Sequence, residues 1–145
     1  MSCSKADQAV FYDTEGHAVQ LSKLKGKWVI LNYWADWCNA CVQEIPELNR
    51  FYQNIKGKNI VFYGIDNDEL SLDDLKSSIL SVSIKYPVLI SDPGYAWHLD
   101  NVAVIPTTFI LDPYGHLVKV ITGPNTESSL FDIINSLQSM AVSSK

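Results

Sequence analysis

Two cysteines separated by two residues, Cys38 and Cys41, constrain this 145-residue chain more than any other feature. They follow an apolar run, Trp28–Trp34, and precede a helical pattern that begins at Cys41. A strand that ends where a helix begins places the first cysteine at the helix N-terminus, where free backbone N–H groups and the helix dipole stabilise a thiolate. The second cysteine follows one turn later, close enough to form a disulfide with the first. The pattern therefore predicts a redox-active dithiol.

Composition and length favour one folded domain over residues 1–145. The chain is 47% hydrophobic and 11% aromatic, which is enough for a core. Eleven basic and sixteen acidic residues give a net charge of −5, and the acids are scattered, so no nucleic-acid partner is expected. No apolar run approaches the roughly 20 residues of a membrane span. We expect a soluble monomer with flexible ends at residues 1–8 and 140–145.

The third cysteine, Cys3, stands apart from the pair in a short polar tail. Two interpretations of it stay open. One is a leftover thiol without a role. The other is the lipid-bearing cysteine of a bacterial lipoprotein whose signal segment is not part of this sequence.

Strand and helix patterns alternate along the chain. Residues 10–21 predict an N-terminal hairpin around an Asp-x-x-Gly turn. The later elements are expected at strand 28–34, helix 41–57, strand 59–65, helix 71–82, strand 87–90, a brief helix 96–101, strands 107–111 and 117–122, and a helix capped by Thr126. This order indicates an α/β fold in which a central mixed β-sheet is flanked by helices on both faces, with the hairpin added.

Two segments resemble the active-site segments of the thioredoxin superfamily. Residues 34–41, Trp-Ala-Asp-Trp-Cys-Asn-Ala-Cys, resemble its active-site motif, and residues 104–109, Val-Ile-Pro-Thr-Thr-Phe, resemble its cis-proline loop. The closer similarity is to the TlpA/ResA-like branch of thiol-disulfide oxidoreductases, which residues 31–34, 44–46, 106–112 and 118–123 also match. The resemblance runs from Val10 to Leu137. It implies a thioredoxin-like fold and a protein-disulfide oxidoreductase.

The resemblance implies that Cys38 is the attacking, partly exposed thiolate and that Cys41 is the more buried resolving thiol. The helix N-terminus favours the same order, because it stabilises the first thiolate. Cys38 is then expected to form a mixed disulfide with the substrate, and Cys41 to displace the reduced product.

Glu44 is the candidate that takes the proton of Cys41. Thioredoxins proper usually carry a buried aspartate on the strand before the motif, and Asn32 stands at that position here. Glu44 lies three residues after Cys41, on the same helical face, and matches an active-site glutamate of ResA-like proteins. A solvated helix glutamate is the alternative, which the match in position outweighs.

Pro106, Ile105 and Trp37 are the expected substrate-binding residues. In the family the proline is cis and faces the cysteines, whereas only about 5–6% of X-Pro bonds in folded proteins are cis. An ordinary trans proline at the start of a strand is therefore the alternative. The backbone of the preceding residue, Ile105, is expected to pair with the substrate chain as an added strand. Trp37 is expected to flank the site next to Cys38.

The resemblance further implies the reduction of protein disulfides outside the cytoplasm, of the cytochrome c biogenesis type. It implies apocytochrome c as a substrate, a membrane thiol-disulfide electron donor, and a periplasmic or membrane-anchored location. We expect no cofactor besides the Cys38–Cys41 disulfide. The intervening Asn39-Ala40 lacks the proline that the family often has there. The two residues between the cysteines tune the reduction potential, which ranges from about −270 to −120 mV across such proteins. Because neither of them is a proline or a histidine, we expect a reducing rather than a strongly oxidising protein.

Two other functions stay open for a Cys-x-x-Cys pair. One is a metal- or copper-handling module, and the other is a redox-sensing interaction protein. A zinc site would need two more ligands, and His17, His98 and His116 are isolated from one another. The only methionines are Met1 and Met140, which weakens the copper interpretation.

Overall fold

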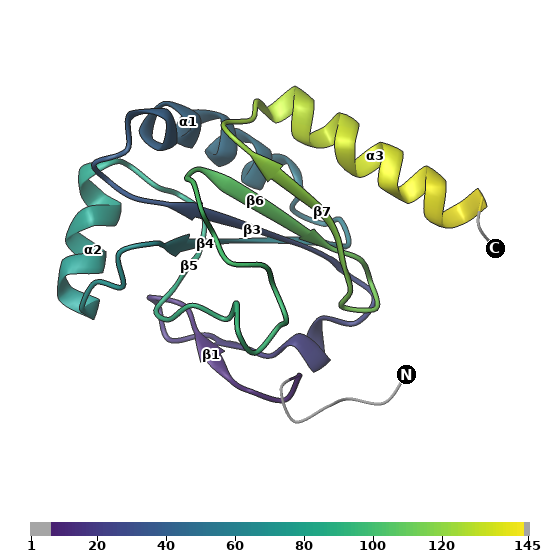
Figure 1. Ribbon diagram of the computed structural model, residues 1–145, viewed down its shortest axis with the longest axis horizontal. Coiled ribbons are helices and arrows are strands. Elements are labelled where there is room, and N and C mark those ends of the chain that lie inside the picture. Colours follow the sequence, from purple (N-terminus) through teal and green to yellow (C-terminus); the bar gives the residue numbers. More distant parts are fainter. Residues whose placement is uncertain (1–6, 144–145) are drawn as a thin grey trace.

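The computed structural model describes residues 7–143 (Figure 1). Cys3 lies outside these residues, and so does the lipidation site that the sequence leaves open there. The described chain forms a small two-stranded sheet and a five-stranded sheet with helices packed against it. None of the described helices is long and apolar enough to cross a membrane.

The five-stranded sheet is mixed, as predicted, with the strand order β5-β4-β3-β6-β7. Its strands are β3 (Trp28–Trp34), β4 (Ile60–Asp66), β5 (Val88–Leu89), β6 (Thr107–Leu111) and β7 (Leu117–Thr122). β3, β4 and β5 run parallel, whereas β6 pairs antiparallel with both β3 and β7. The predicted N-terminal hairpin is confirmed as β1 (Phe11–Tyr12) and β2 (Ala18–Val19).

The helices of the described chain are the 3-10 helix η1 (Leu21–Leu24) and the α-helices α1 (Asn39–Asn54), α2 (Leu72–Ser81) and α3 (Glu127–Ser143). Ser71 caps α2, because its Oγ accepts a hydrogen bond from the Asp74 N–H at 3.3 Å. Thr126 Oγ1 likewise accepts from the Ser129 N–H at 3.0 Å where α3 begins. α3 continues to Ser143, past the Met140 at which the sequence predicts a flexible end, since extending an existing helix needs no new nucleation.

β3 lies at the centre of the sheet, and all seven of its residues are buried. Successive side chains of a strand point to opposite faces, so Ile30 and Trp34 belong to one core and Val29 and Tyr33 to the other. A strand that is apolar on both sides suits a sheet covered on both faces. The end of β3 brings the chain directly to the Cys38 region.

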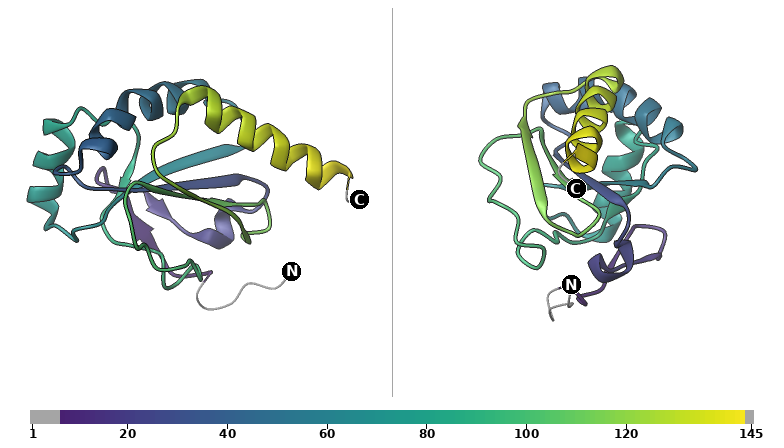
Figure 2. Two further views of the ribbon diagram at one scale, coloured as in Figure 1. Left: turned by 45° about the horizontal axis from the view of Figure 1, so that its top comes forward. Right: turned by 90° about the vertical axis from the view of Figure 1, so that its right-hand side faces the viewer.

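The prediction of helices on both faces needs a correction. In residues 7–143, all three α-helices contribute to the same core, for example through Leu48, Leu75 and Leu130. The opposite face is covered by the hairpin, η1 and the loop of residues 90–106, with Leu21 and Trp97 buried there (Figure 2). The connections β3-α1-β4 and β4-α2-β5 step across the sheet in the same direction. Because parallel crossovers are right-handed, α1 and α2 must then lie on one face.

The brief helix predicted at residues 96–101 is wrong, because the chain forms turns at residues 94–98 and no regular structure at residues 99–101. The Trp97 N–H donates to the carbonyl of Pro93 at 2.9 Å and the Leu99 N–H to that of Gly94 at 2.8 Å. His98 has a φ of +57°, in the left-handed region, which stops a right-handed helix. Trp97 is 2% exposed and anchors this loop in the core.

Candidate active site

Cys38 and Cys41 are joined by a disulfide at the start of α1, with their Cα atoms 5.2 Å apart. Cys38 is the N-cap residue, so the helix begins two residues before the predicted Cys41. The Cys38 Sγ accepts a hydrogen bond from the Cys41 N–H at 3.2 Å. A sulfur in this position receives one of the free N–H groups of the helix and lies at the positive end of its dipole.

The two cysteines differ in their access to solvent. Cys38 is 8% exposed, whereas Cys41, one turn into α1, is 1% exposed. The strand before them ends in a turn in which the Cys38 N–H donates to the carbonyl of Ala35 at 3.2 Å. The helix-terminal, more accessible position favours Cys38 as the sulfur that meets a substrate first.

The cis-proline loop lies against Cys38. The Ile105–Pro106 peptide bond is cis, and the carbonyl oxygen of Ile105 lies 3.8 Å from Cys38 Sγ. The sheet creates this contact, because Tyr33 near the end of β3 pairs with Thr107 at the start of β6. Neither the N–H nor the carbonyl of Ile105 makes a backbone hydrogen bond to any described residue.

Glu44 is 2% exposed, so the alternative of a solvated helix glutamate is wrong. Its Oε1 accepts a hydrogen bond from Asn32 Nδ2 at 3.0 Å. Its Oε2 accepts from the Asn125 N–H at 2.6 Å and from Asn125 Nδ2 at 3.4 Å. Burial raises the pKa of the Glu44 carboxyl above its ordinary value, although the hydrogen bonds from Asn125 and Asn32 oppose this effect. Such a carboxylate is a stronger proton acceptor than a solvated one.

Asn32 connects the glutamate to the strand that carries the proline loop. It is fully buried, pairs with Thr108 across β3 and β6, and donates from Nδ2 to Thr108 Oγ1 at 3.1 Å. The same Nδ2 group also donates a hydrogen bond to Glu44 Oε1 on α1. One amide therefore links β3, α1 and β6.

Asn125 is a site residue that the sequence does not reveal. It lies in the connection between β7 and α3 and reaches Glu44 across 81 positions of the chain. Nothing in the local pattern marks it, since an asparagine before a helix has an ordinary role as a cap or turn residue. Its partner is set by the packing of α3 beside α1.

Trp37 is 67% exposed, and its indole Nε1 donates to Asp68 Oδ2 at 2.7 Å. Asp68 belongs to the acidic loop that follows β4. The structure places this loop beside the motif, because the Asn67 N–H donates to the carbonyl of Trp34 at 2.8 Å. No group of three His, Cys, Asp or Glu side chains in residues 7–143 is arranged to hold a metal ion.

Similarity to known proteins extends over most of the chain. A family model, the AhpC/TSA family, matches residues 4–120. The thiol-disulfide oxidoreductase ResA of Bacillus subtilis (strain 168) is 33% identical over 132 residues, which cover 91% of this chain and 73% of that protein. ResA of Geobacillus kaustophilus (strain HTA426) is 32% identical over 129 residues, covering 88% and 72%.

Solved structures agree with this similarity. StoA from Bacillus subtilis superposes with a TM-score of 0.69 at 26% identity, covering 86% of this chain and 96% of that one. A thiol:disulfide interchange protein from Chlorobium tepidum TLS gives a TM-score of 0.71 at 27% identity, covering 93% and 98%.

Proposed function

Since the chain belongs to the AhpC/TSA family and is a thiol-disulfide oxidoreductase with a thioredoxin-like fold, we propose that it reduces protein disulfides outside the cytoplasm through Cys38 and Cys41. The observation that carries this proposal is the position of Cys38. Its sulfur caps α1, accepts a helix N–H, and is linked to the more buried Cys41.

The first step uses the reduced dithiol. The Cys38 thiolate, stabilised by the helix N-terminus, attacks one sulfur of the substrate disulfide. A new S–S bond forms between Cys38 and that sulfur, while the substrate S–S bond breaks. The other substrate sulfur leaves as a thiolate and takes a proton from water.

The second step releases the substrate. Cys41 gives its proton to the Glu44 carboxylate, which lies one helical turn further along α1. The Cys41 thiolate attacks Cys38 Sγ, the Cys38–Cys41 bond forms, and the mixed disulfide breaks. The second substrate sulfur leaves as a thiolate, so two electrons have passed to the substrate. A dithiol donor returns the two electrons to Cys38 and Cys41 in a further exchange.

Substrate positioning depends on the loop opposite Cys38. The backbone groups of Ile105, which make no backbone–backbone hydrogen bond to the described residues, support its role as the docking edge for an extended substrate segment. Pro106 holds this edge against the sulfur, and the exposed indole of Trp37 offers an apolar contact surface beside it.

The physiological task that we assign is the reduction of apocytochrome c before haem attachment, with electrons from a membrane dithiol protein. The resemblance of residues 31–46 and 104–123 to the TlpA/ResA-like branch and the ResA relatives support this assignment. The same support applies to a periplasmic or membrane-anchored location.

Trapping in the native host tests the proposal. Cys41→Ser removes the resolving sulfur, so the mixed disulfide between Cys38 and its substrate accumulates and can be identified by mass spectrometry. We expect adducts to proteins with their own Cys-x-x-Cys pair. Cys38→Ser is the matched control and should give none. Stoichiometric metal binding without reduction of any protein disulfide would instead favour the metal-handling alternative.

A further inference from the structure

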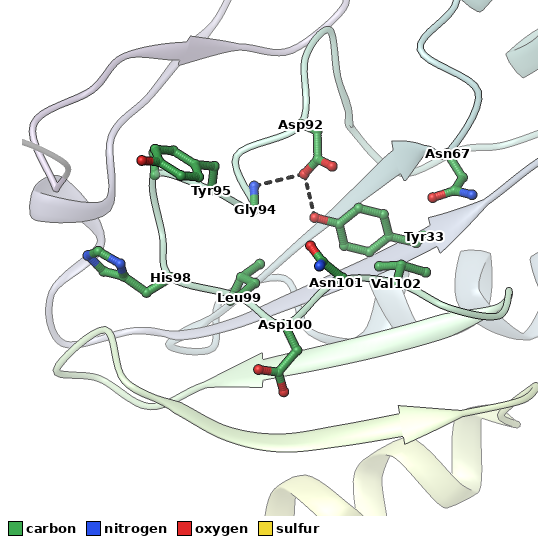
Figure 3. A pocket seen from close by; sticks show the side chains of 11 residues that line it. Tyr33, Asn67, Asp92, Gly94, Tyr95, His98, Leu99, Asp100, Asn101 and Val102 are labelled. Atoms are coloured by element: carbon green, nitrogen blue, oxygen red, sulfur yellow. Dashed lines mark hydrogen bonds between the residues drawn. The ribbon is translucent and has the colours of Figure 1, made fainter.

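A hollow of about 900 Å³ opens on the face of the sheet opposite α1 (Figure 3). Three segments line it: Tyr33 of β3, Asn67 after β4, and residues 92–102 of the loop that leads to Pro106. We call it the Asp92 hollow. The catalytic scheme above uses none of its side chains.

Two hydrogen bonds orient the exposed side chain of Asp92 at one end of this hollow. Tyr33 Oη donates to Asp92 Oδ1 at 2.5 Å, and the Gly94 N–H donates to the same oxygen at 2.8 Å. Burial, together with the bond to Asp92 and its charge, raises the pKa of Tyr33 far above its usual range, so Tyr33 remains a donor. No described residue donates to the second oxygen, Oδ2. The carboxylate is therefore oriented with one acceptor left for a ligand.

The backbone of Gly94 lies close to Asp92 and Tyr33, and this makes the arrangement possible. A Cβ atom on Gly94 would lie 3.0 Å from Asp92 Oδ1 and 3.1 Å from Tyr33 Oη, tighter than ordinary contacts. Only glycine leaves both partners where they are. The hydrogen bonds that orient Asp92 therefore depend on a glycine at position 94.

The charged side chains of the hollow are mainly acidic. Its described lining contains Asp92 and, at the other end in Figure 3, Asp100, together with His98 but no lysine or arginine. A smaller hollow of about 420 Å³ shares Asp92 and is also lined by Asp66 and Glu69 and by the apolar residues Ile65, Leu70, Leu75, Leu89 and Ile90. Asp66 is only 7% exposed, and its Oδ2 lacks a hydrogen-bond partner among the described residues. Both hollows therefore present carboxylates that lack a cationic partner among residues 7–143.

The Asp92 hollow lies between the two segments that frame Cys38. On one side, Asn67 donates its backbone N–H to the carbonyl of Trp34, just before the motif. On the other side, Val102 precedes Ile105 by three residues. A substrate segment docked on Ile105 can therefore place a side chain near its half-cystine into the hollow.

We propose that the Asp92 hollow binds a lysine or arginine side chain close to the disulfide of the protein substrate. This inference rests on the proposed function and names the class of substrate that the same site prefers. The aliphatic stem of such a side chain packs along apolar walls such as Leu99 and Val102, and its cationic head pairs with Asp92 Oδ2. The preorganised carboxylate limits the entropy lost on binding.

Disulfide peptides test this preference. In one series, lysine is placed at each position around the half-cystine in turn. The second series carries glutamine at the same positions and is otherwise identical. We expect kcat/KM for the best lysine peptide to exceed that of its glutamine counterpart about three- to tenfold, and this ratio to shrink as salt is added.

Asp92→Asn is the decisive variant, because the asparagine Oδ1 still accepts from Tyr33 and Gly94 while the charge at the second position is lost. The lysine-to-glutamine ratio should fall to about one. Asp132→Asn is the matched control, since Asp132 is exposed on α3 across the sheet, and it should keep the wild-type ratio. A ratio near one in the wild-type protein, or an unchanged ratio in Asp92→Asn, overturns the proposal.

A direct binding measurement separates this inference from the proposed function. If the wild-type protein reduces none of the peptides, the proposed function fails. The charge preference is then measured by fluorescence anisotropy, with Cys38→Ser protein and labelled peptides whose cysteines are replaced by serine. If lysine peptides bind more tightly than glutamine peptides, and this difference disappears when Asp92→Asn is added, the hollow is a cation site. Equal binding of both series overturns it.

Discussion

The side-chain amide of Asn32 donates a 3.0 Å hydrogen bond to Glu44, and this bond joins the central strand β3 to the helix that begins at the dithiol. Both residues are buried, and Asn32 also donates to Thr108 on β6. The carboxylate is therefore held by neutral donors rather than by a cation. Burial without a compensating positive charge raises its pKa, which suits a group that must accept a proton from Cys41.

Glu44→Gln should slow the release of substrate from the mixed disulfide by about 100-fold or more, because general-base catalysis is lost. In the wild-type protein this rate should fall as the pH drops through the raised pKa of Glu44, and Glu44→Gln should lack that step. Rapid-mixing kinetics across the pH range measure both effects. An identical pH profile in the two proteins would exclude the role assigned to Glu44.

The free energy of unfolding should also depend on pH through the raised pKa of Glu44. A carboxyl whose pKa is raised on folding binds more protons in the folded than in the unfolded state, so its contribution is present below the unfolded pKa and is lost as the pH rises through the folded pKa. Urea unfolding of the oxidised wild-type protein should show this decrease in the free energy of unfolding as the pH rises. In Glu44→Gln this part of the pH dependence should be absent.

Asn32→Asp should raise the pKa of Glu44 further, because a second carboxylate replaces the donor at 3.0 Å. We expect a loss of about 1–3 kcal/mol in the free energy of unfolding, from the lost buried hydrogen bonds, and a shift of the activity profile to higher pH. Chemical denaturation and pH-rate measurements test this. Asn135→Asp, exposed on α3, is the control and should change neither quantity appreciably.

After reduction, Cys38 should react with iodoacetamide much faster than Cys41. Its sulfur is the more exposed of the two and lies at the N-terminus of α1, where the thiolate is stabilised. Quenched-flow alkylation followed by peptide mass spectrometry gives the two rates. Faster labelling of Cys41 would reverse the order of attack in the proposed mechanism.

Asp68→Ala should lower kcat/KM for protein substrates about two- to tenfold, because the Trp37 indole loses its hydrogen-bond acceptor and with it a fixed orientation. The melting temperature should change little, since both side chains are at the surface. Asp132→Ala provides the charge-matched control. If the two variants have the same kcat/KM, the Trp37–Asp68 contact does not contribute to substrate binding.

Local sequence patterns account for most of the secondary structure. The apolar run Trp28–Trp34 matches β3, and the Ser71 cap matches the start of α2. The prediction fails at residues 96–101, where a brief helix is expected and the chain forms none. There the left-handed backbone of His98 and burial against the sheet outweigh local periodicity.

The sequence by itself determined the dithiol at a strand-to-helix junction, the order of the elements, and Glu44 one turn beyond Cys41, because these depend on neighbours within a few residues. Only the tertiary structure decided that Asn32 and Asn125 hold Glu44, that the α-helices of the described chain share one face, and that Tyr33 fixes Asp92. Those features join residues 12 to 81 positions apart. They arise from strand pairing and from the handedness of the crossovers, which no local pattern of residues encodes.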